Sequence, residues 1–408
     1  MRAFLPLLLL IILCKPGFTA RFDALREEGF VIVSADGPDD GGDFGPKTPG
    51  TTTAGIGEAL QYLEKANTDQ HRSLNLYISS GHYSTSDTIH IPWLGERLQI
   101  DAREAWIDYT PTHGDALVID SQMNGRLRFG YISGMQLTDG WIVKVKPVHP
   151  GPSAPLPKER QSSVIVSTLI EFNAIVAKEY FKDGVAQRGN GILLDASVGP
   201  ILWSTVDISE INTCGVGAQL TGNCHYNTID LWFNHGCNTH LQIDQGVSQN
   251  RIYSAINSEK VPESIGALIA GKRNTLSLAM TQVAKGKSVI FEKPAQFNVV
   301  QLNDSRYGFT NNAPLGANRI VANDELSIKT PQVPQSETAL INPVPAVVEV
   351  LILDPGDVRG WSLQAPGETE QKISAGLHAG QQIQLRSGES ISLRYRKRPP
   401  KWHWRTSP

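Results

Sequence analysis

The middle of the chain carries a short pattern of alternating apolar and polar positions that returns at a regular interval. Four segments begin with an asparagine, at Asn227, Asn250, Asn274 and Asn298, and each continues as an alternation of apolar and polar residues. A related segment begins at Ser204, so the five starting positions lie 23, 23, 24 and 24 residues apart. Such alternation is typical of half-buried β-strands, and its return about every 20 to 25 residues is typical of a solenoid.

A second set of short apolar segments lies between these strands, at residues 216–222, 239–244, 266–271 and 288–292. Two or more short strands per repeat, with no helix-length segment between them, exclude a leucine-rich horseshoe and favour a parallel β-helix. Strands of successive coils would stack at about 4.8 Å. Asparagines repeated at one corner would then hydrogen-bond to the next coil's backbone and to each other, which satisfies polar groups that a tight corner buries.

Both ends of such a stack must be covered, because the last strands would otherwise expose unpaired backbone groups. Ile56, Leu60 and Leu63 recur at helical spacing, with Thr52 or Thr53 available as N-cap, so we expect a helix that caps the N-terminal end.

The C-terminal part has a different pattern. Residues 331–346 are rich in proline and are interpreted as a linker, and the alternating segments beyond them predict a small β-structured module or cap over residues 346–408. The predicted fold is therefore all-β: a right-handed parallel β-helix over residues 21–330, with an N-terminal capping helix and a small C-terminal β module.

The first twenty residues have the pattern of an export signal. Arg2 is followed by an apolar run that reaches Cys14, and then by a breaker and small residues that end at Ala20. The run is too short for a permanent membrane-spanning helix, so residues 1–20 are interpreted as a signal peptide. We therefore expect a secreted or periplasmic protein, and no later apolar segment is long enough to cross a bilayer.

Composition narrows the classes of partner. A net charge of -3, 19% charged residues and no sustained basic stripe argue against nucleic acid, whose phosphates need clustered Lys and Arg. Only Cys214, Cys224 and Cys237 follow the signal peptide, too few for a disulfide-stapled small fold. Cys214 and Cys237 are 23 residues apart and occupy the same place in neighbouring coils, either as a disulfide or as two packed thiols.

The N-terminal part of the chain carries a further ordered set of residues. An Asp-Phe-Gly segment that starts at Asp43 leads through a Thr-rich loop into the expected helix, and a Gly-x-Tyr turn at Gly81 and Tyr83 and a strand ending in Ile91 and Pro92 follow. This order resembles the opening of pectin-lyase-like β-helix proteins, the pectate lyase superfamily.

The resemblance implies a right-handed parallel β-helix, a scaffold on which extended sugar polymers are bound or cut. It implies fold more than reaction, since that superfamily spans lyases, hydrolases, epimerases and phage tailspikes. The sequence departs from the family in two respects. First, residues 51–53 are all Thr, where the family usually has an acidic pair. The chain also lacks the Asn-Thr-Asp, Asp-Asp and Gly-His-Gly set of polygalacturonases and a clear Arg-x-Pro-x-x-Arg of pectate lyases, which counts against pectin as the substrate.

One outer face of the predicted strands gathers acidic, basic and aromatic side chains. If Ile229, Leu231 and Phe233 point inward, their neighbours on the same strand point outward. The repeat then places Asp207 beside Asp230, with Cβ atoms about 5 Å apart. We assign catalytic roles to Asp207, Asp230, Arg251, Tyr253 and His235, and substrate binding to Trp203, Glu210, Trp232, Asn234 and Asn257.

Two carboxylates this close favour a protonated acid beside an ionised base, and their spacing is near that of retaining glycosidases. Alternatively, the pair holds Ca²⁺, with Arg251 or Tyr253 near the proton that a lyase abstracts. Solvated surface acids are the third interpretation. A zinc site is not expected, because no HxxxH or CxxC spacing appears on one element.

The function expected from these features is that of an exported carbohydrate-active enzyme, a glycoside hydrolase or polysaccharide lyase, whose polymer lies in a groove on the outer face. Two alternatives stay open: a non-catalytic polysaccharide-binding or surface-adhesion β-helix, and a uronan C5 epimerase or glycosyl transferase. The sequence leaves the polymer, the linkage and the oligomeric state open.

Overall fold

The structure, a computed structural model, describes residues 16–69, 72–148, 163–177, 189–258, 261, 263–324, 326 and 328–406. Within these ranges the fold is all-β and contains two α-helices, α1 (Pro16–Glu27) and α2 (Ile56–Asp69), and one short 3₁₀-helix (Gly37–Asp40). The chain divides into two compact units, Met1–Cys237 and Asn238–Pro408. Each unit is described by itself, and the boundary predicted at residues 331–346 stays a prediction.

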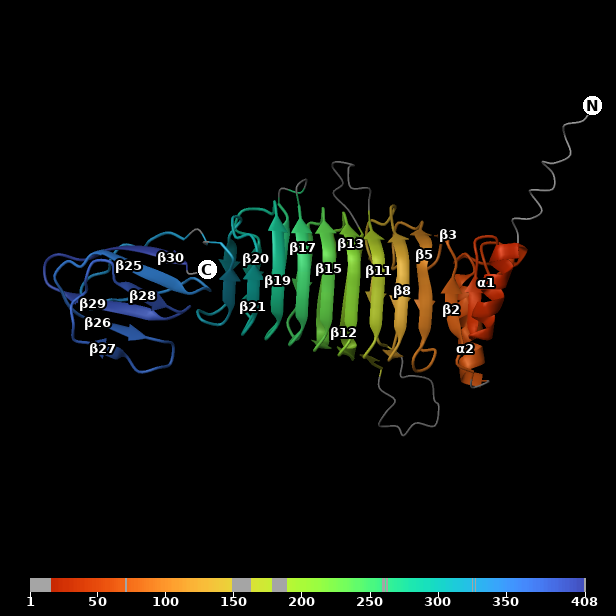
Figure 1. The fold of residues 1–408 in the computed structure, drawn as a ribbon, viewed down its shortest axis with the longest axis horizontal. Helices are drawn as coiled ribbons and strands as arrows, with labels where there is room; N and C mark the ends of the chain where they lie inside the picture. Colours follow the sequence, from red (N-terminus) through yellow and green to blue (C-terminus); the bar gives the residue numbers. More distant parts are fainter. Residues whose placement is uncertain are drawn as a thin grey trace, which may run out of the picture. The chain divides into compact units, whose positions relative to one another are not determined.

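Parallel strands form two sheets in the first unit, and those of the first sheet lie side by side in Figure 1. The first sheet contains, in spatial order, β1 (Phe30–Val33), β2 (Asn75–Ile78), β5 (Gln99–Tyr109), β8 (Arg126–Ser133), β11 (Leu169–Val176), β13 (Thr205–Asn212) and β15 (Thr228–His235), and β3 (Gly81–Thr85) pairs with β5. The second sheet contains β14 (Val216–His225), β12 (Asn190–Leu202), β9 (Trp141–Val145), β6 (Leu117–Ile119) and β4 (Ile89–Ile91), and β10 (Ile165–Val166) pairs with both β12 and β7 (Gln122–Met123).

The second unit continues with the same kind of strand. One parallel set is β17 (Arg251–Asn257), β19 (Thr275–Thr281), β21 (Val299–Leu302) and β23 (Arg319–Ala322), and the other is β22 (Phe309–Asn311), β20 (Val289–Phe291), β18 (Ile265–Ile269) and β16 (Thr239–Ile243). Two sheets of parallel strands, visited in turn by the chain, are compatible with a parallel β-helix.

The last strands of the chain pair antiparallel. One small sheet has the order β24 (Ala339–Ile341), β29 (Ser390–Tyr395), β26 (Val358–Gln364) and β27 (Gln371–Ile373), and the other has β28 (Gln382–Leu385), β25 (Val348–Asp354) and β30 (Lys401–Thr406). β24 lies inside the stretch that the sequence predicts as a linker, where it pairs with β29.

The repeat predicted from the sequence is confirmed within each unit. On β13 and β15, Asp207 lies opposite Asp230. On β17, β19 and β21, Tyr253 lies opposite Ser277, and Ser277 opposite Gln301. Each strand begins one residue after the polar residue that marks its repeat.

The corner asparagines of the second unit form a buried ladder. The Asn250 backbone N–H donates to Asn274 Oδ1 at 3.0 Å, and the Asn274 N–H donates to Asn298 Oδ1 at 3.0 Å. The ladder extends to Asn318, whose Oδ1 accepts from the Asn298 N–H at 3.1 Å, a member that the sequence pattern did not identify. In the first unit Asn227 makes the equivalent bond, because its Oδ1 accepts from the Ser204 N–H at 2.9 Å.

The residue before each corner adopts a left-handed backbone, with φ between 48° and 58° at Trp203, Tyr226, Gln249, Arg273 and Phe297. A left-handed residue turns the chain sharply, and the polar residue that follows can then point into the corner. The turn thus separates two roles: the polar side chain at the corner is buried, and the preceding aromatic or long side chain is exposed.

The predicted helix is present as α2, which begins at Ile56, and Thr53 provides a side-chain acceptor for its first turn. Thr53 Oγ1 accepts from the Gly57 N–H at 2.9 Å, and Ile56, Leu60 and Leu63 are each at most 2% exposed. The helix therefore buries the apolar face that the helical spacing identifies, and it packs against β1, β2 and β4.

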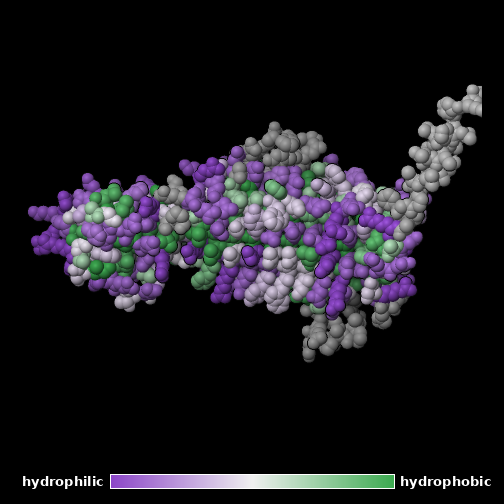
Figure 2. Space-filling view, in the orientation of Figure 1, coloured by the Kyte–Doolittle hydropathy of each residue, from purple (hydrophilic) through white to green (hydrophobic). Residues whose placement is uncertain are grey.

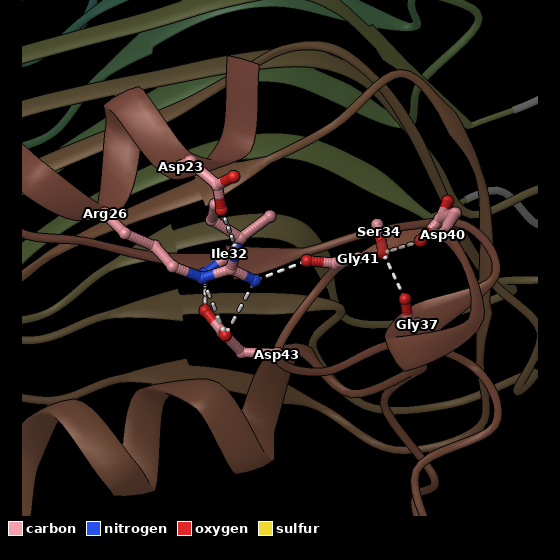
Figure 3. Close-up of polar contacts among 8 residues, drawn as sticks. All are labelled: Asp23, Arg26, Ile32, Ser34, Gly37, Asp40, Gly41 and Asp43. Atoms are coloured by element: carbon pink, nitrogen blue, oxygen red, sulfur yellow. Dashed lines mark hydrogen bonds and ion pairs between the residues drawn. The ribbon is translucent and has the colours of Figure 1, made fainter. Parts of the chain in front are cut away.

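The Asp-Phe-Gly segment contacts both α1 and β1, and Figure 3 shows the contacts of Asp43. Asp43 Oδ2 accepts from the Ile32 N–H of β1 at 2.8 Å, and Asp43 Oδ1 accepts from Arg26 of α1 at 3.0 Å. Position 45 requires a glycine, because a Cβ there would lie 2.3 Å from the Ser34 carbonyl oxygen. These contacts give the Asp-Phe-Gly segment a structural role.

The three described cysteines are buried and form no disulfide, so of the two sequence alternatives the structure has packed thiols and no Cys214–Cys237 disulfide. Burial raises the pKa of the Cys224 thiol to about 12, although Asn227 donates a hydrogen bond to its sulfur.

Residues 1–15 of the predicted signal peptide lie outside the described residues, and residues 16–20 form the start of α1. In the part of the chain that the structure covers, no helix is both long and apolar enough to cross a bilayer.

Candidate functional site

A column of charged side chains crosses the outward face of the first sheet in the first unit. Register partners on β8, β11, β13 and β15 are Arg128, Glu171, Asp207 and Asp230, in that order. Arg128 forms an ion pair with Glu171. Asp207 and Asp230 are half-buried, as expected for polar residues that alternate with the buried residues Val206, Ile208, Ile229 and Leu231.

Trp232 holds one of the two predicted catalytic acids. Its indole Nε1–H donates to Asp207 Oδ1 at 2.9 Å, while 49% of the Trp232 surface stays exposed. The carboxylate is therefore fixed by a neutral donor, and the aromatic ring lies beside it on the surface. This contact joins a residue assigned to substrate binding with a residue assigned to catalysis.

The alternation along β15 slips by one residue after Trp232. Phe233 is 67% exposed and Asn234 is fully buried, so the sequence assignment of Phe233 to the interior and of Asn234 to the outer face is wrong. The same slip occurs on β13, where Ser209 and Glu210 both face outward. Two successive outward residues mark a bend in each strand, and beyond the bend the inward positions move by one.

The bend brings Glu210 and His235 together. His235 Nε2 and Glu210 Oε1 lie 2.9 Å apart, and Asn212 Nδ2 donates to the same carboxylate oxygen at 3.2 Å. The hydrogen bond from His235 lowers the pKa of Glu210, although partial burial opposes the shift. A carboxylate that orients an imidazole is a common arrangement for general acid–base work. Glu210, assigned to substrate binding, thus contacts His235, assigned to catalysis.

Exposed aromatic side chains lie on other strands of the same sheet and at the turns that lead into it. Trp203, also assigned to substrate binding, is 61% exposed and stacks on Tyr226 with ring centroids 6.0 Å apart. On β5 and β8, Trp106 stacks on Tyr131 at 5.6 Å, and His82 of β3 meets Trp106 edge-on at 5.7 Å. Centroid distances this long require the stacked rings to be slipped, which leaves part of each face uncovered.

Trp106 is also fixed through its polar end. Its Nε1–H donates to Ser133 Oγ at 3.1 Å, and the Ser133 hydroxyl donates to Asp108 Oδ1 at 2.6 Å. Figure 2 shows this side of the strands as a mixture of hydrophilic and hydrophobic side chains. Such a mixed surface suits a sugar polymer better than an apolar partner.

The remaining predicted residues belong to the second unit. Arg251, Tyr253 and Asn257 all lie on β17. Arg251 is exposed, and Tyr253 and Asn257 are half-buried. Their side chains alternate with those of the buried residues Ile252 and Ile256, so the outward register predicted for this strand is confirmed.

Sequence reasoning missed several members of this surface: Arg128, Glu171, Trp106, Tyr131 and His82. The apolar alternation of residues 169–172 and 126–129 was available as a signal, but it falls outside the regular interval.

The described residues of this surface do not form a set of metal ligands. Among the residues described, no three His, Cys, Asp or Glu side chains are grouped so as to hold a metal. Asp207 and Asp230 alone provide only part of the six to eight oxygen ligands, roughly, that Ca²⁺ takes. No step is therefore assigned to calcium.

The geometry permits acid–base chemistry on a ligand that lies on this face of the sheet. The face offers a carboxylate pair, a third carboxylate that contacts a histidine, and aromatic rings on several strands. In comparisons with known proteins, the chain matches no family model and no curated protein.

Proposed function

We propose that the protein is an exported enzyme that cleaves a polysaccharide, as a glycoside hydrolase or a polysaccharide lyase, with Asp207 and Asp230 as its acid–base pair. The observation that carries the proposal is the register of β13 and β15, which places these carboxylates opposite each other on adjacent strands. In this proposal one carboxyl group protonates the leaving oxygen, and the other acts as base or nucleophile.

The sugar polymer is proposed because aromatic and charged side chains alternate on one surface. Rings such as Trp232 and Trp203 would take the C–H faces of sugar rings, and the acids would accept hydrogen bonds from hydroxyl groups. Glu210 and His235 lie on the same two strands, beyond the bend, and would bind or deprotonate a neighbouring sugar unit.

The proposal also includes the type of fold and the ends of the strand stack. We infer a right-handed parallel β-helix of the pectin-lyase-like type, with α2 covering its N-terminal end and the antiparallel strands after residue 338 forming a C-terminal module. Removal of residues 1–20 as a signal peptide would place the mature protein outside the cytoplasm. The contacts described for α1 come from residues beyond that cut, such as Phe22 and Arg26.

The test is a panel of neutral and uronic polysaccharides incubated with the purified protein. New reducing ends without unsaturated products indicate a hydrolase, and absorbance from unsaturated uronic products indicates a lyase. Asp207→Asn and Asp230→Asn should each lower the rate by about 10² to 10⁴, because each removes one proton-transfer group. Full activity in either variant would remove that residue from the mechanism.

Asp139→Asn is the matched control. This exposed carboxylate pairs with His113 at 2.9 Å and is not a register partner of either acid. Its replacement should leave the rate unchanged, and circular dichroism of all three variants should match the unchanged protein.

A non-catalytic polysaccharide-binding protein is the second candidate, favoured by the ring column formed by His82, Trp106 and Tyr131 on three strands. If that is the function, the polymer is retained, no new ends appear, and Trp106→Ala weakens retention while Asp230→Asn does not. An epimerase would instead change the sugar's NMR signals without cleaving the chain.

A further inference from the structure

The second unit contains a cavity of about 670 Å³ that lies well away in sequence from the acids of the first unit. Its walls come from the turn before β21, the loop and first residue of β23, the segment 345–347 and the loop after β28. The volume falls within the range of small-molecule sites, roughly 300 to 1,000 Å³.

Two arginines line this cavity and no acidic residue does. Arg319 and Arg386 are both exposed, and neither guanidinium forms an ion pair with a carboxylate of the described residues. Glu389 lies near the second loop, where its carboxylate accepts from the Arg386 backbone N–H at 2.8 Å. A cavity with two uncommitted guanidinium groups favours an anionic ligand.

An aromatic ring lies at the same cavity. Phe297 is 61% exposed at one of the left-handed turn positions, and the Arg273 guanidinium lies 5.8 Å from its ring centroid. Ser387 adds a hydroxyl group, whose oxygen accepts from the Gly316 N–H at 3.2 Å and whose own proton remains available for a ligand. The cavity thus combines an apolar face with cationic and hydroxyl donors.

We propose that this cavity binds a sugar ring that carries a carboxylate, a uronic acid unit. The planar guanidinium groups of Arg319 and Arg386 take the carboxylate, since the fork of N–H donors matches its two oxygens. Phe297 takes the C–H face of the ring, and the Ser387 hydroxyl donates to a ring substituent. The anionic character follows from the cavity alone, and the choice of a sugar rests on the proposed function.

The experiment measures the affinity of the full chain for D-glucuronate by ligand-observed NMR, with D-glucose and a sulfated glucose as comparison ligands. Glucuronate should bind at least about tenfold more tightly than glucose, because hydrogen bonds to a charged group are the stronger ones. Equal binding of glucose, or tighter binding of the sulfated sugar, would overturn the assignment of a carboxylate.

Arg319→Ala and Arg386→Ala should each weaken glucuronate binding by about tenfold or more, and raised salt should weaken it in the unchanged protein. Arg359→Ala is the control, because Arg359 is an exposed arginine of β26 that does not line the cavity. Unchanged affinity in both cavity variants would refute the site. Loss of polysaccharide cleavage in the acid variants, with glucuronate binding retained, would separate this site from the proposed function.

Discussion

The asparagine ladder makes a quantitative prediction at Asn274, its fully buried middle member. The side-chain oxygen of Asn274 accepts from the Asn250 N–H at 3.0 Å and from Asn250 Nδ2 at 3.1 Å, and its Nδ2 donates to Asn298 Oδ1 at 3.1 Å. Asn274→Ala leaves one buried backbone N–H without its acceptor, which costs about 1–3 kcal/mol, and removes further hydrogen bonds worth about 1 kcal/mol net. We expect the free energy of unfolding to fall by about 2–4 kcal/mol.

The measurement is urea unfolding followed by circular dichroism, together with hydrogen exchange of the peptide that contains the Asn250 amide. Exchange at that amide should accelerate, because its acceptor has been removed. Asn323→Ala is the control: its amide donates to Asn303 Oδ1 at 2.9 Å on the exposed surface, so the change should stay within about 0.5 kcal/mol. If the two variants unfold at the same urea concentration, the ladder does not contribute as described.

Three further predictions concern single groups of the first unit. The hydrogen bond from His235 lowers the pKa of Glu210, so the stability from this pair is present above the ordinary Glu pKa and is lost as pH falls through the lowered value. Glu210→Gln should therefore show a shallower loss of stability below about pH 4.5 in acid-dependent urea unfolding. Because burial raises the pKa of the Cys224 thiol to about 12, a thiolate reagent at about pH 8 should label it only after unfolding, and rapid native labelling would count against that burial. Trp232→Phe keeps a ring but removes the donor to Asp207, so polymer retention should persist while cleavage slows, and an unchanged cleavage rate would show that the contact is dispensable.

The later strands could be predicted from the sequence because no insertion interrupts their repeat. From β13 to β15 and from β17 to β21 the interval is 23 or 24 residues, and the register follows from counting. The last interval, from β21 to β23, is shorter, at 20 residues. The earlier partners on β5, β8, β11 and β13 begin at Gln99, Arg126, Leu169 and Thr205, so their intervals are 27, 43 and 36 residues. Chain inserted between strands hides a repeat from counting, although the strands still pair in register. The proline-rich insertion at 147–163 is one cause, and its residues 149–162 lie outside those described.

The site was predicted in part for the same reason. The pairing of Asp207 with Asp230 follows from the interval alone. The interval does not predict that Phe233 is exposed and Asn234 buried. These positions depend on the bend that shifts the alternation, and the bend depends on how the strands pack and not on the local pattern. The contact between Glu210 and His235 depends on that bend.

The loop that follows β1 also has a consequence for how separate copies of this protein behave. The Ile32 carbonyl accepts from the N–H groups of Asp43 and Phe44, and the Ser34 N–H donates to the Phe44 carbonyl. These are positions that a strand of a second molecule would need in order to extend the sheet, and exposed strand edges of this kind are where aggregation and fibre growth start. Because the chain fills these positions itself, we expect β1 to resist end-to-end pairing with a second molecule, and Asp43, which accepts from the Ile32 N–H, contributes to this cover.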